Sequence, residues 1–325
     1  MVNILMLSKW HVHAVGYAKT IAAQPDAQIT CVWDEDAERG KAWAAELGVP
    51  FEACLTTALG RSDVDAVIIE TATSEHKDVM IAAANAGKHI FTEKAMALTV
   101  AECEAISEAV KRNGVKFCIS FPHITNPHIQ LCKNAIEQGL LGKVHYMRMR
   151  TAHDGSSRDW LPKYWYDVEK AGGGAMMDLG CHPMYVASYL LGKPTRIASM
   201  FNNSFAPVPA EDNAVSVVEF EDKAIAVLET SFVSPFNSGV FELLGTKGAI
   251  IFQDGKVRMR TTEQQGGWFT PDKLPEALPA AIRMWLDGIE KGCPIPFDTQ
   301  RGTALTELLE NAYLSHNEQR IVAVK

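Results

Sequence analysis

Short apolar runs alternate with helix-like segments over about the first 120 residues, and this alternation restricts the fold more than any other feature of the chain. The run 64–71 is almost continuously apolar, as a strand buried on both faces should be. Strands that alternate with helices of about 10–15 residues are typical of right-handed βαβ units in a parallel sheet. The expected strands are 4–7, 28–33, 64–71, 89–92 and 115–120, and the expected helices are 14–23, 36–47, 76–86 and 99–113. We therefore predict an N-terminal α/β domain whose ligands lie beyond the carboxyl ends of its strands.

The pattern changes after about residue 142, where longer strand-like segments begin. Two of the connections between them, 220–223 and 254–255, are as short as the turns of hairpins, and such turns join antiparallel neighbours. The expected strands here are 143–153, 195–203, 214–219, 224–232, 240–244, 249–253 and 257–261, with a final helix over about 302–315. We predict two domains: a Rossmann-type domain with a parallel sheet over 1–122, and an α+β domain with a large, mostly antiparallel sheet over 123–325.

Composition excludes several classes of protein. A length of 325 residues suits two domains. The net charge of -8, without a basic run, argues against nucleic acid and against an anionic membrane surface as partners. No apolar run is long enough to span a bilayer, and the first residues lack the regions of a signal peptide. The 7 widely spaced cysteines without a CxxC pair favour reduced thiols in a cytoplasmic protein.

Asp34 follows the second expected strand. In a dinucleotide-binding domain, an acid at this place accepts hydrogen bonds from the adenosine ribose and repels a 2′-phosphate, which favours NAD over NADP. The alternative is that Asp34 only caps the next helix, because aspartate is a preferred N-cap residue.

The loop after the first strand lacks the glycines that let a backbone approach a pyrophosphate. It reads Ser8-Lys9-Trp10-His11-Val12-His13-Ala14. Ser8, Lys9 and the histidines can bind phosphate through their side chains as well as through the backbone. His11 and His13 are also candidate metal ligands, but no acidic or cysteine partner lies at ligand spacing, so we expect no metal site. A third interpretation is that the loop has lost nucleotide binding and that Trp10 fills the space.

Two further stretches carry candidate catalytic side chains. A lysine at the end of the fourth strand, in Glu93-Lys94, can orient a substrate hydroxyl or relay its proton, although an arbitrary Glu-Lys pair is more often solvated. The segment 172–183 begins with three glycines, and its Asp178 and His182 share a face if the stretch is helical. An aspartate beside a histidine makes that histidine a competent general base. The alternative is a helix-start histidine with an unrelated capping aspartate.

Aromatic and polar residues cluster ahead of this glycine-rich segment. Together with His123 they could line a polar pocket with flat faces, which suits a sugar ring. The alternative is an exposed rim or a subunit interface, where tryptophan, tyrosine and arginine are also enriched. The cluster comprises His153, Asp154, Arg158, Trp160, Tyr164, Trp165 and Tyr166.

Taken together, these stretches resemble the Gfo/Idh/MocA family of nicotinamide-dependent oxidoreductases. The segment 63–94 is similar to the third and fourth strand region of that family, which ends at its Glu-Lys-Pro motif. Asn126-Pro127 and 139–144 resemble the start of the family's second domain, and 172–182 resembles its glycine-rich Asp-x-x-x-His motif. The similarity covers essentially the whole chain, in order.

The resemblance implies that Lys94, Asp178 and His182 are catalytic. His182 would take the hydroxyl proton while C4 of the nicotinamide takes the hydride, Asp178 would orient the substrate or His182, and Lys94 would contact the reacting oxygen. The cofactor NAD would lie against Ser8, Lys9, Trp10, His11, His13, Asp34, Thr71, Thr73, His76, Glu93 and Lys94. The substrate would contact His123, His153, Asp154, Trp165 and Tyr166.

The chain departs from the family pattern in the missing glycines, in Ala95 where the motif has proline, and in Ile124 or Thr125 where many members have arginine. Our leading hypothesis is an NAD-dependent dehydrogenase that acts on a secondary alcohol of a sugar, sugar acid or cyclitol, the family's usual substrates. The alternatives are a redox-neutral lyase or glycosidase with tightly bound NAD, and a non-catalytic regulator that senses a sugar or nucleotide. Exposed strands in the second domain indicate a homodimer or homotetramer built on that sheet, as in the family.

Overall fold

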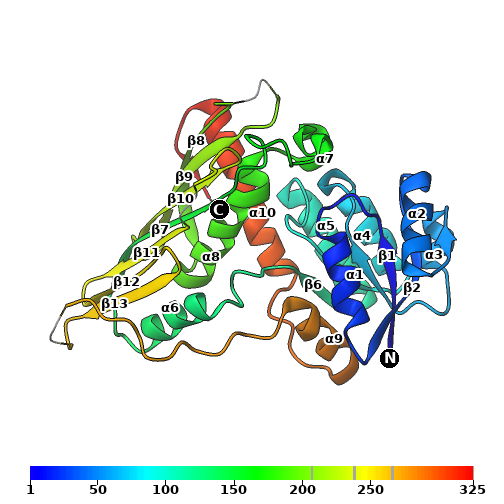
Figure 1. Ribbon diagram of the computed structural model, residues 1–325, viewed down its shortest axis with the longest axis horizontal. Coiled ribbons are helices and arrows are strands. Elements are labelled where there is room, and N and C mark those ends of the chain that lie inside the picture. The colour runs from blue at the N-terminus through cyan, green and yellow to red at the C-terminus, as the bar shows by residue number, and fades with distance from the viewer. Residues whose placement is uncertain (206–207, 237–238, 265–266, 325) are drawn as a thin grey trace. The chain divides into compact units, whose positions relative to one another are not determined.

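The computed structural model describes residues 1–205, 208–236, 239–264 and 267–324 (Figure 1). The chain forms two compact units. Unit 1 comprises 1–120 and 280–306, and unit 2 comprises 121–279 and 307–325. No helix within the described residues has both the length and the apolar content needed to cross a bilayer.

Unit 1 is built on a six-stranded parallel sheet in the order β3-β2-β1-β4-β5-β6. The strands are β1 (Val2–Leu7), β2 (Ala27–Trp33), β3 (Phe51–Glu52), β4 (Ala66–Ile69), β5 (His89–Thr92) and β6 (Phe117–Ile119). The helices between them are α1 (Ala14–Ala22), α2 (Ala37–Leu47), α3 (Leu55–Leu59), the short η1 (Thr73–Glu75), α4 (His76–Asn85) and α5 (Val100–Asn113). All four residues of β4 are buried, as the continuous apolar run predicts. The strand order reverses between β1 and β4, and ligands of such sheets bind where the order reverses.

The segment 280–306 also belongs to unit 1, whereas the sequence division at residue 122 places it in the second domain. Its helix α9 (Ala281–Lys291) contacts β5 and β6. The fully buried Trp285 packs on Phe91, with ring centroids 5.6 Å apart. Arg283 donates to Asp26 over 2.8 Å. The helix α10 (Thr299–Glu318) begins in unit 1 and ends in unit 2.

Unit 2 is built on an eight-stranded sheet in the order β13-β12-β11-β7-β10-β9-β8-β14. Its strand pairs are antiparallel except for β7 and β10, which run parallel. The strands are β7 (Val144–Ala152), β8 (Pro194–Asn202), β9 (Asn213–Phe220), β10 (Ile225–Ser231), β11 (Val240–Gly245), β12 (Gly248–Gln253), β13 (Lys256–Thr261) and β14 (Val322–Ala323). The helical segments are α6 (Pro127–Glu137), η2 (Lys163–Tyr166), α7 (Val168–Ala171), η3 (Met176–Gly180) and α8 (Cys181–Leu191). The predicted fold class, a parallel α/β unit followed by a mostly antiparallel α+β unit, is confirmed.

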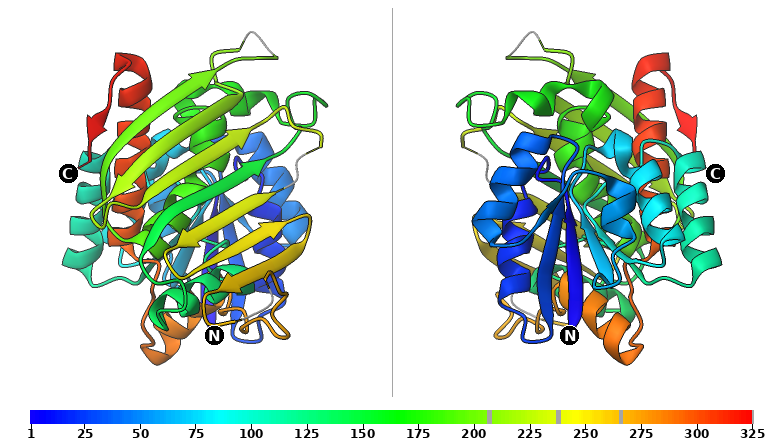
Figure 2. Two further views of the ribbon diagram at one scale, coloured as in Figure 1. Left: turned by 90° about the vertical axis from the view of Figure 1, so that its left-hand side faces the viewer. Right: turned by 90° about the vertical axis from the view of Figure 1, so that its right-hand side faces the viewer.

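One face of the large sheet of unit 2 carries exposed apolar side chains. Residues of β9 alternate between buried and exposed, so one set of side chains faces the core and the other faces solvent. Figure 2 (left) shows this sheet with the helices of unit 2 behind it. The exposed apolar residues on β8, β9 and β10 are Met200, Val215, Val217 and Ile225.

Candidate active-site residues in the two units

The loop after β1 makes a glycine-like turn without glycine. Ser8 has a φ of 76°, in the left-handed region that glycine adopts with least strain. The Ser8 hydroxyl accepts the backbone N–H of Trp10 over 3.0 Å, which closes the turn. The Trp10 side chain is buried at 4% exposure, and the Lys9 ammonium bonds Glu46 on α2 over 2.8 Å. The loop is therefore held by its own side chains and by α2.

Asp34 is buried after β2 and accepts four hydrogen bonds. Two come from the backbone N–H groups of Lys9 and Asp36, over 2.9 and 2.8 Å. The other two come from Arg39, over 2.9 Å from Nε and 2.6 Å from Nη2. A carboxylate has about four acceptor sites, so a ribose hydroxyl can reach this carboxylate only by replacing one of these donors. The N-cap residue of α2 is Asp36 and not Asp34.

The loop after β4 holds buried polar atoms without hydrogen bonds. Thr71 is 1% exposed, and its hydroxyl has no hydrogen-bond partner among the described residues. The Glu70 carboxylate is fully buried and likewise accepts no hydrogen bond. Because this loop lies where the strand order reverses, these orphaned groups suit a polar ligand such as a dinucleotide.

The His76 side chain lies between two loops of the same region. Its Nε2 lies 3.2 Å from the Thr71 carbonyl oxygen, and its Nδ1 lies 3.0 Å from that of Ala95. Burial lowers the pKa of His76. The ring therefore ties the loop after β4 to the loop after β5, while Thr73 is buried nearby in η1.

Glu93 is the centre of a polar cluster after β5. It is 2% exposed, its Oε1 lies 3.1 Å from His13 Nδ1, and the Tyr17 hydroxyl donates to the same oxygen. Burial alone would raise the pKa of Glu93, but the hydrogen bond from His13 and the charges of His11 and Lys94 outweigh it and hold the pKa well below its usual value. Burial and the Glu93 charge raise the pKa of Tyr17. Glu93 is thus a buried carboxylate in a basic environment.

Lys94 follows directly and is buried at 5% exposure. Its backbone N–H donates to Glu93 Oε2 over 3.2 Å, and the peptide bond that joins it to Ala95 is cis. A buried lysine is uncommon unless it has a charged partner, and Glu93 supplies that charge here.

In unit 2, His182 lies in the first turn of α8 and is bound by Tyr185 one turn further on. His182 Nδ1 is 2.8 Å from the Tyr185 hydroxyl oxygen, which also accepts the backbone N–H of His123 over 3.2 Å. The rings of His123 and His182 lie 4.6 Å apart. If the Nδ1 proton is donated to Tyr185, Nε2 of His182 keeps its lone pair and can accept a proton.

The glycine-rich segment ahead of His182 is fixed by a buried carboxyl group. Asp178 lies in η3, a single turn of π-helix of a kind often found at functional sites. Glu211 accepts the backbone N–H groups of Gly174 and Met176, each over 2.9 Å, and the Tyr313 hydroxyl over 2.7 Å. A Cβ atom at Gly174 would collide with the Glu211 backbone, so the close approach requires glycine.

The predicted substrate residues fall into two groups. His153, Asp154 and Tyr166 belong to one loop, in which Asp154 accepts the Trp160 indole N–H over 2.8 Å and Tyr166 bonds the Ser156 hydroxyl over 2.7 Å. The His153 ring stacks on Phe232, and Trp165 is buried. His123 belongs instead with His182 and Tyr185.

A cavity of about 300 Å³ lies beside His123, between α6 and strands β7, β11 and β12. Its lining includes the polar side chains of Asn126, His128, Arg150 and Thr151 and the rings of Phe241 and Phe252. A volume of this size accommodates a single small ring, and the mixed lining suits one that has both hydroxyl groups and C–H faces.

Sequence reasoning missed the partners of the predicted residues. Tyr185 lies three residues after His182 and Tyr17 four after His13, and both spacings place side chains on one helix face. These two could have been found from the helical period. Arg39, Glu211 and Tyr313 could not. Arg39 reaches Asp34 only through the turn at the start of α2. Tertiary folding alone brings Glu211 and Tyr313 to the glycines.

Comparison with known proteins agrees with this geometry. Residues 14–121 match a family model described as "Oxidoreductase family, NAD-binding Rossmann fold", and residues 129–251 match "GFO/IDH/MocA C-terminal domain". Among curated proteins, the chain is 33% identical over 242 residues to scyllo-inositol 2-dehydrogenase (NAD(+)) of Bacillus subtilis, covering 71% of this chain and 67% of that protein. It is 26% identical to myo-inositol 2-dehydrogenase of Thermotoga maritima, over 95% of both chains.

A solved structure shares the whole fold. Levoglucosan dehydrogenase in complex with NADH and levoglucosan superposes with a TM-score of 0.87 and 21% identity, over 99% of both chains. At this identity the likeness shows the common fold.

Proposed function

Because this chain belongs to the Gfo/Idh/MocA family of NAD-dependent oxidoreductases, we propose that it transfers a hydride between NAD and a secondary alcohol or ketone of a cyclitol, sugar or sugar acid. The observation that carries the proposal is the ligand edge of unit 1, the set of loops that follow β1, β2, β4 and β5 at the carboxyl ends of these parallel strands. There an NAD-binding Rossmann sheet has the buried Thr71 hydroxyl, which has no hydrogen-bond partner in the described part of the chain, where its strand order reverses. Relatives named for inositols and for 1,5-anhydro-D-fructose support the substrate class.

The residues of the ligand edge fit a dinucleotide. The side chains proposed to hold it are Ser8, Lys9, Trp10, His11, His13, Asp34, Thr71, Thr73, His76, Glu93 and Lys94. Asp34 disfavours a 2′-phosphate by its charge, which supports NAD over NADP. When bound, NAD supplies the hydride acceptor.

We propose Lys94, Asp178 and His182 as the catalytic residues. His182 accepts the hydroxyl proton at Nε2, and Tyr185, which contacts Nδ1, holds the ring and selects its tautomer. Lys94 donates a hydrogen bond to the reacting oxygen and stabilises the charge that develops there. Asp178 orients the substrate or His182.

The substrate contacts are proposed at His123, His153, Asp154, Trp165 and Tyr166. His123 supports this assignment best, because it borders the small cavity and its ring lies 4.6 Å from that of His182. The cavity admits one ring, which agrees with a cyclitol or monosaccharide.

The test is NADH formation by the purified protein with NAD and a panel that includes myo-inositol, scyllo-inositol and levoglucosan. His182→Gln and Lys94→Met should each lower kcat by about 10²–10⁴-fold, the usual effect of losing a general acid or base. His145→Gln, which changes an exposed histidine, is the matched control. Cleavage of a glycoside without net formation of NADH would instead indicate a lyase or glycosidase. Binding of NAD or of a sugar without turnover would indicate a non-catalytic sensor.

Tyr185→Phe tests how His182 is positioned. The variant keeps the ring that stacks on Phe121 at 4.3 Å but removes the hydroxyl that contacts His182. We expect kcat to fall about tenfold, equivalent to one hydrogen bond of ~1.4 kcal/mol, with a shifted pH profile and an unchanged KM for NAD. An unaltered pH profile would show that Tyr185 has no influence on His182.

We further propose a cytoplasmic homo-oligomer. The exposed apolar face of the unit 2 sheet supports self-association, since isolated apolar side chains are common on surfaces but contiguous groups mark interfaces. All seven cysteines are free thiols, which supports a reducing compartment.

A further inference from the structure

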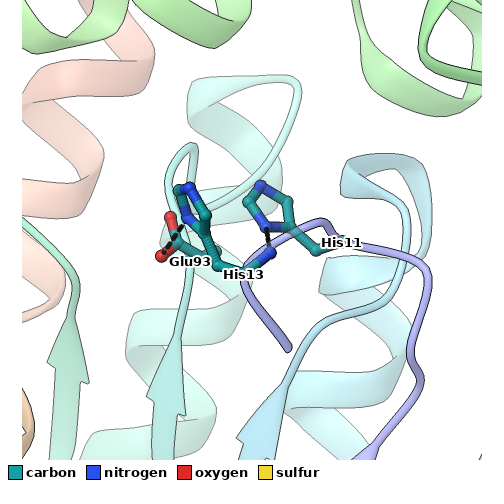
Figure 3. A group of neighbouring side chains, drawn as sticks. All are labelled: His11, His13 and Glu93. Carbon is teal, nitrogen blue, oxygen red and sulfur yellow. Dashed lines mark hydrogen bonds and ion pairs between the residues drawn. The ribbon is translucent and has the colours of Figure 1, made fainter. Parts of the chain in front are cut away.

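Two histidines and a glutamate from separate parts of unit 1 come together at its ligand edge. His11 and His13 follow β1, and Glu93 follows β5, 80 residues further along the chain than His13. One potential ligand atom from each of the three residues lies within 4.8 Å of the others. Figure 3 shows the two imidazole rings side by side, with the Glu93 carboxylate next to His13. Folding thus supplies the acidic partner that the local sequence lacks.

The arrangement is close to that of a metal site. The 3.1 Å between His13 Nδ1 and Glu93 Oε1 is about the separation of two ligands on one small cation, whose bonds to nitrogen and oxygen are about 2.0–2.2 Å long. The imidazole rings of His11 and His13 lie edge to face, with centroids 4.7 Å apart. His13 is half exposed, so an ion has access from solvent, whereas Glu93 is buried and fixed by Tyr17.

A second, independent observation concerns Glu70. Its carboxylate is fully buried, accepts no hydrogen bond from any residue that the structure describes, and lies 3.5 Å from His11 Nδ1. Glu70 and Glu93 thus place two buried carboxylates beside one buried lysine, Lys94. A buried carboxylate without a hydrogen bond is costly, and a divalent cation nearby compensates the charge of Glu70.

We propose that His11, His13 and Glu93 form a binding site for a divalent transition-metal ion of the zinc type. Two imidazoles and one carboxylate are the donors of several zinc sites and also suit other first-row ions. Three protein ligands leave a coordination position for an oxygen donor from outside the chain. The backbone N–H of His13 donates to His11 Nδ1 over 3.2 Å and fixes the orientation of the His11 ring. The same three side chains are among those proposed to hold NAD, but the metal site goes beyond the proposed dehydrogenase activity and does not depend on it.

The experiment is equilibrium dialysis of the chelator-treated full chain against Zn²⁺, with Co²⁺ absorption as a second readout of the donor set. We expect one ion per chain at micromolar or lower concentration. His13→Gln should weaken binding at least tenfold, and so should His11→Gln. Because His13 is half exposed, its substitution leaves the core intact, and a thermal melt of each variant verifies folding. His145→Gln, an exposed histidine outside the cluster, should bind as the wild type does.

Absence of stoichiometric binding would overturn the proposal, and so would full binding by a folded His11→Gln, His13→Gln double variant. NAD is titrated separately into the metal-free protein. If NAD binds and Zn²⁺ does not, the metal site alone fails. If Zn²⁺ binds and NAD does not, the metal site stands and the dehydrogenase proposal fails.

Discussion

Replacing Glu211 should destabilise the protein and displace the segment that carries Asp178 and His182. The Glu211 carboxyl group accepts three hydrogen bonds in a buried position, from two backbone N–H groups and the Tyr313 hydroxyl. At about 1 kcal/mol for each bond, Glu211→Ala loses about 3 kcal/mol. It leaves the Met176 N–H and the Tyr313 hydroxyl without this acceptor, whereas the Gly174 N–H keeps a second contact to the Tyr313 oxygen over 3.2 Å. Glu211→Gln turns one acceptor into a donor that faces a donor, so it should lose about 1–3 kcal/mol.

The assay is urea unfolding of the wild type, both Glu211 variants and the surface control Glu221→Gln, for which we expect a change within about 0.5 kcal/mol. Burial raises the pKa of Glu211, so the native protein holds this proton more tightly than the unfolded chain does. The carboxyl group therefore contributes less stability as the pH rises above about 4.5, and the loss in Glu211→Gln should be smaller at pH 8 than at pH 5. A Glu211→Ala variant as stable as the wild type, or a loss in Glu211→Gln that grows with pH, would refute this reasoning.

Three further predictions concern other parts of the chain. The hydrogen bond from Arg283 lowers the pKa of Asp26 to about 2, so the pair stabilises the protein above about pH 4 and this contribution disappears as the pH falls toward 2. Asp26→Asn should then lose about 1 kcal/mol at pH 7 and nothing at pH 2 in urea unfolding; equal losses at both values would contradict it. Val217→Lys, on the exposed apolar sheet face, should lower the mass measured by light scattering, and an unchanged mass would show that the oligomer does not form on this face. Asp34→Ala should release Arg39 and raise the affinity for NADPH relative to NADH by about tenfold in fluorescence titrations, and an unchanged ratio would show that Asp34 does not select the cofactor.

Both sheets could be predicted from the sequence because their strands carry strong local signals. The burial of Ala66–Ile69 follows from its apolar run, and the hairpin turn at Asp254-Gly255 follows from residues that both adopt positive φ. The helix α9 was missed, although its apolar residues follow a helical period, and its place in unit 1 depends on the long-range contact of Arg283 with Asp26.

Within the candidate site, the sequence predicted which residues carry reactive side chains, but not which of these side chains contact each other. The sequence identifies Asp34 as an acid after a strand, but the occupation of its carboxylate by Arg39 depends on the turn of α2 that follows. It shows His11 and His13, but Glu93 reaches them only because β1 and β5 end at the same edge of a parallel sheet. The assignments of the catalytic and substrate residues stay predictions until the variants are measured.

Because residues 280–306 belong to unit 1, this unit is completed only late in protein synthesis. A ribosome releases 1–120 first, yet Phe91 lacks its partner Trp285 until about 160 more residues have been made. Unit 1 therefore has an incomplete core while the ribosome synthesises every strand of unit 2 except β14. An N-terminal domain made of one continuous segment can fold without this delay. A fragment that ends at residue 122 should accordingly expose the surface that α9 covers and aggregate, whereas adding α9 back in trans should restore its solubility.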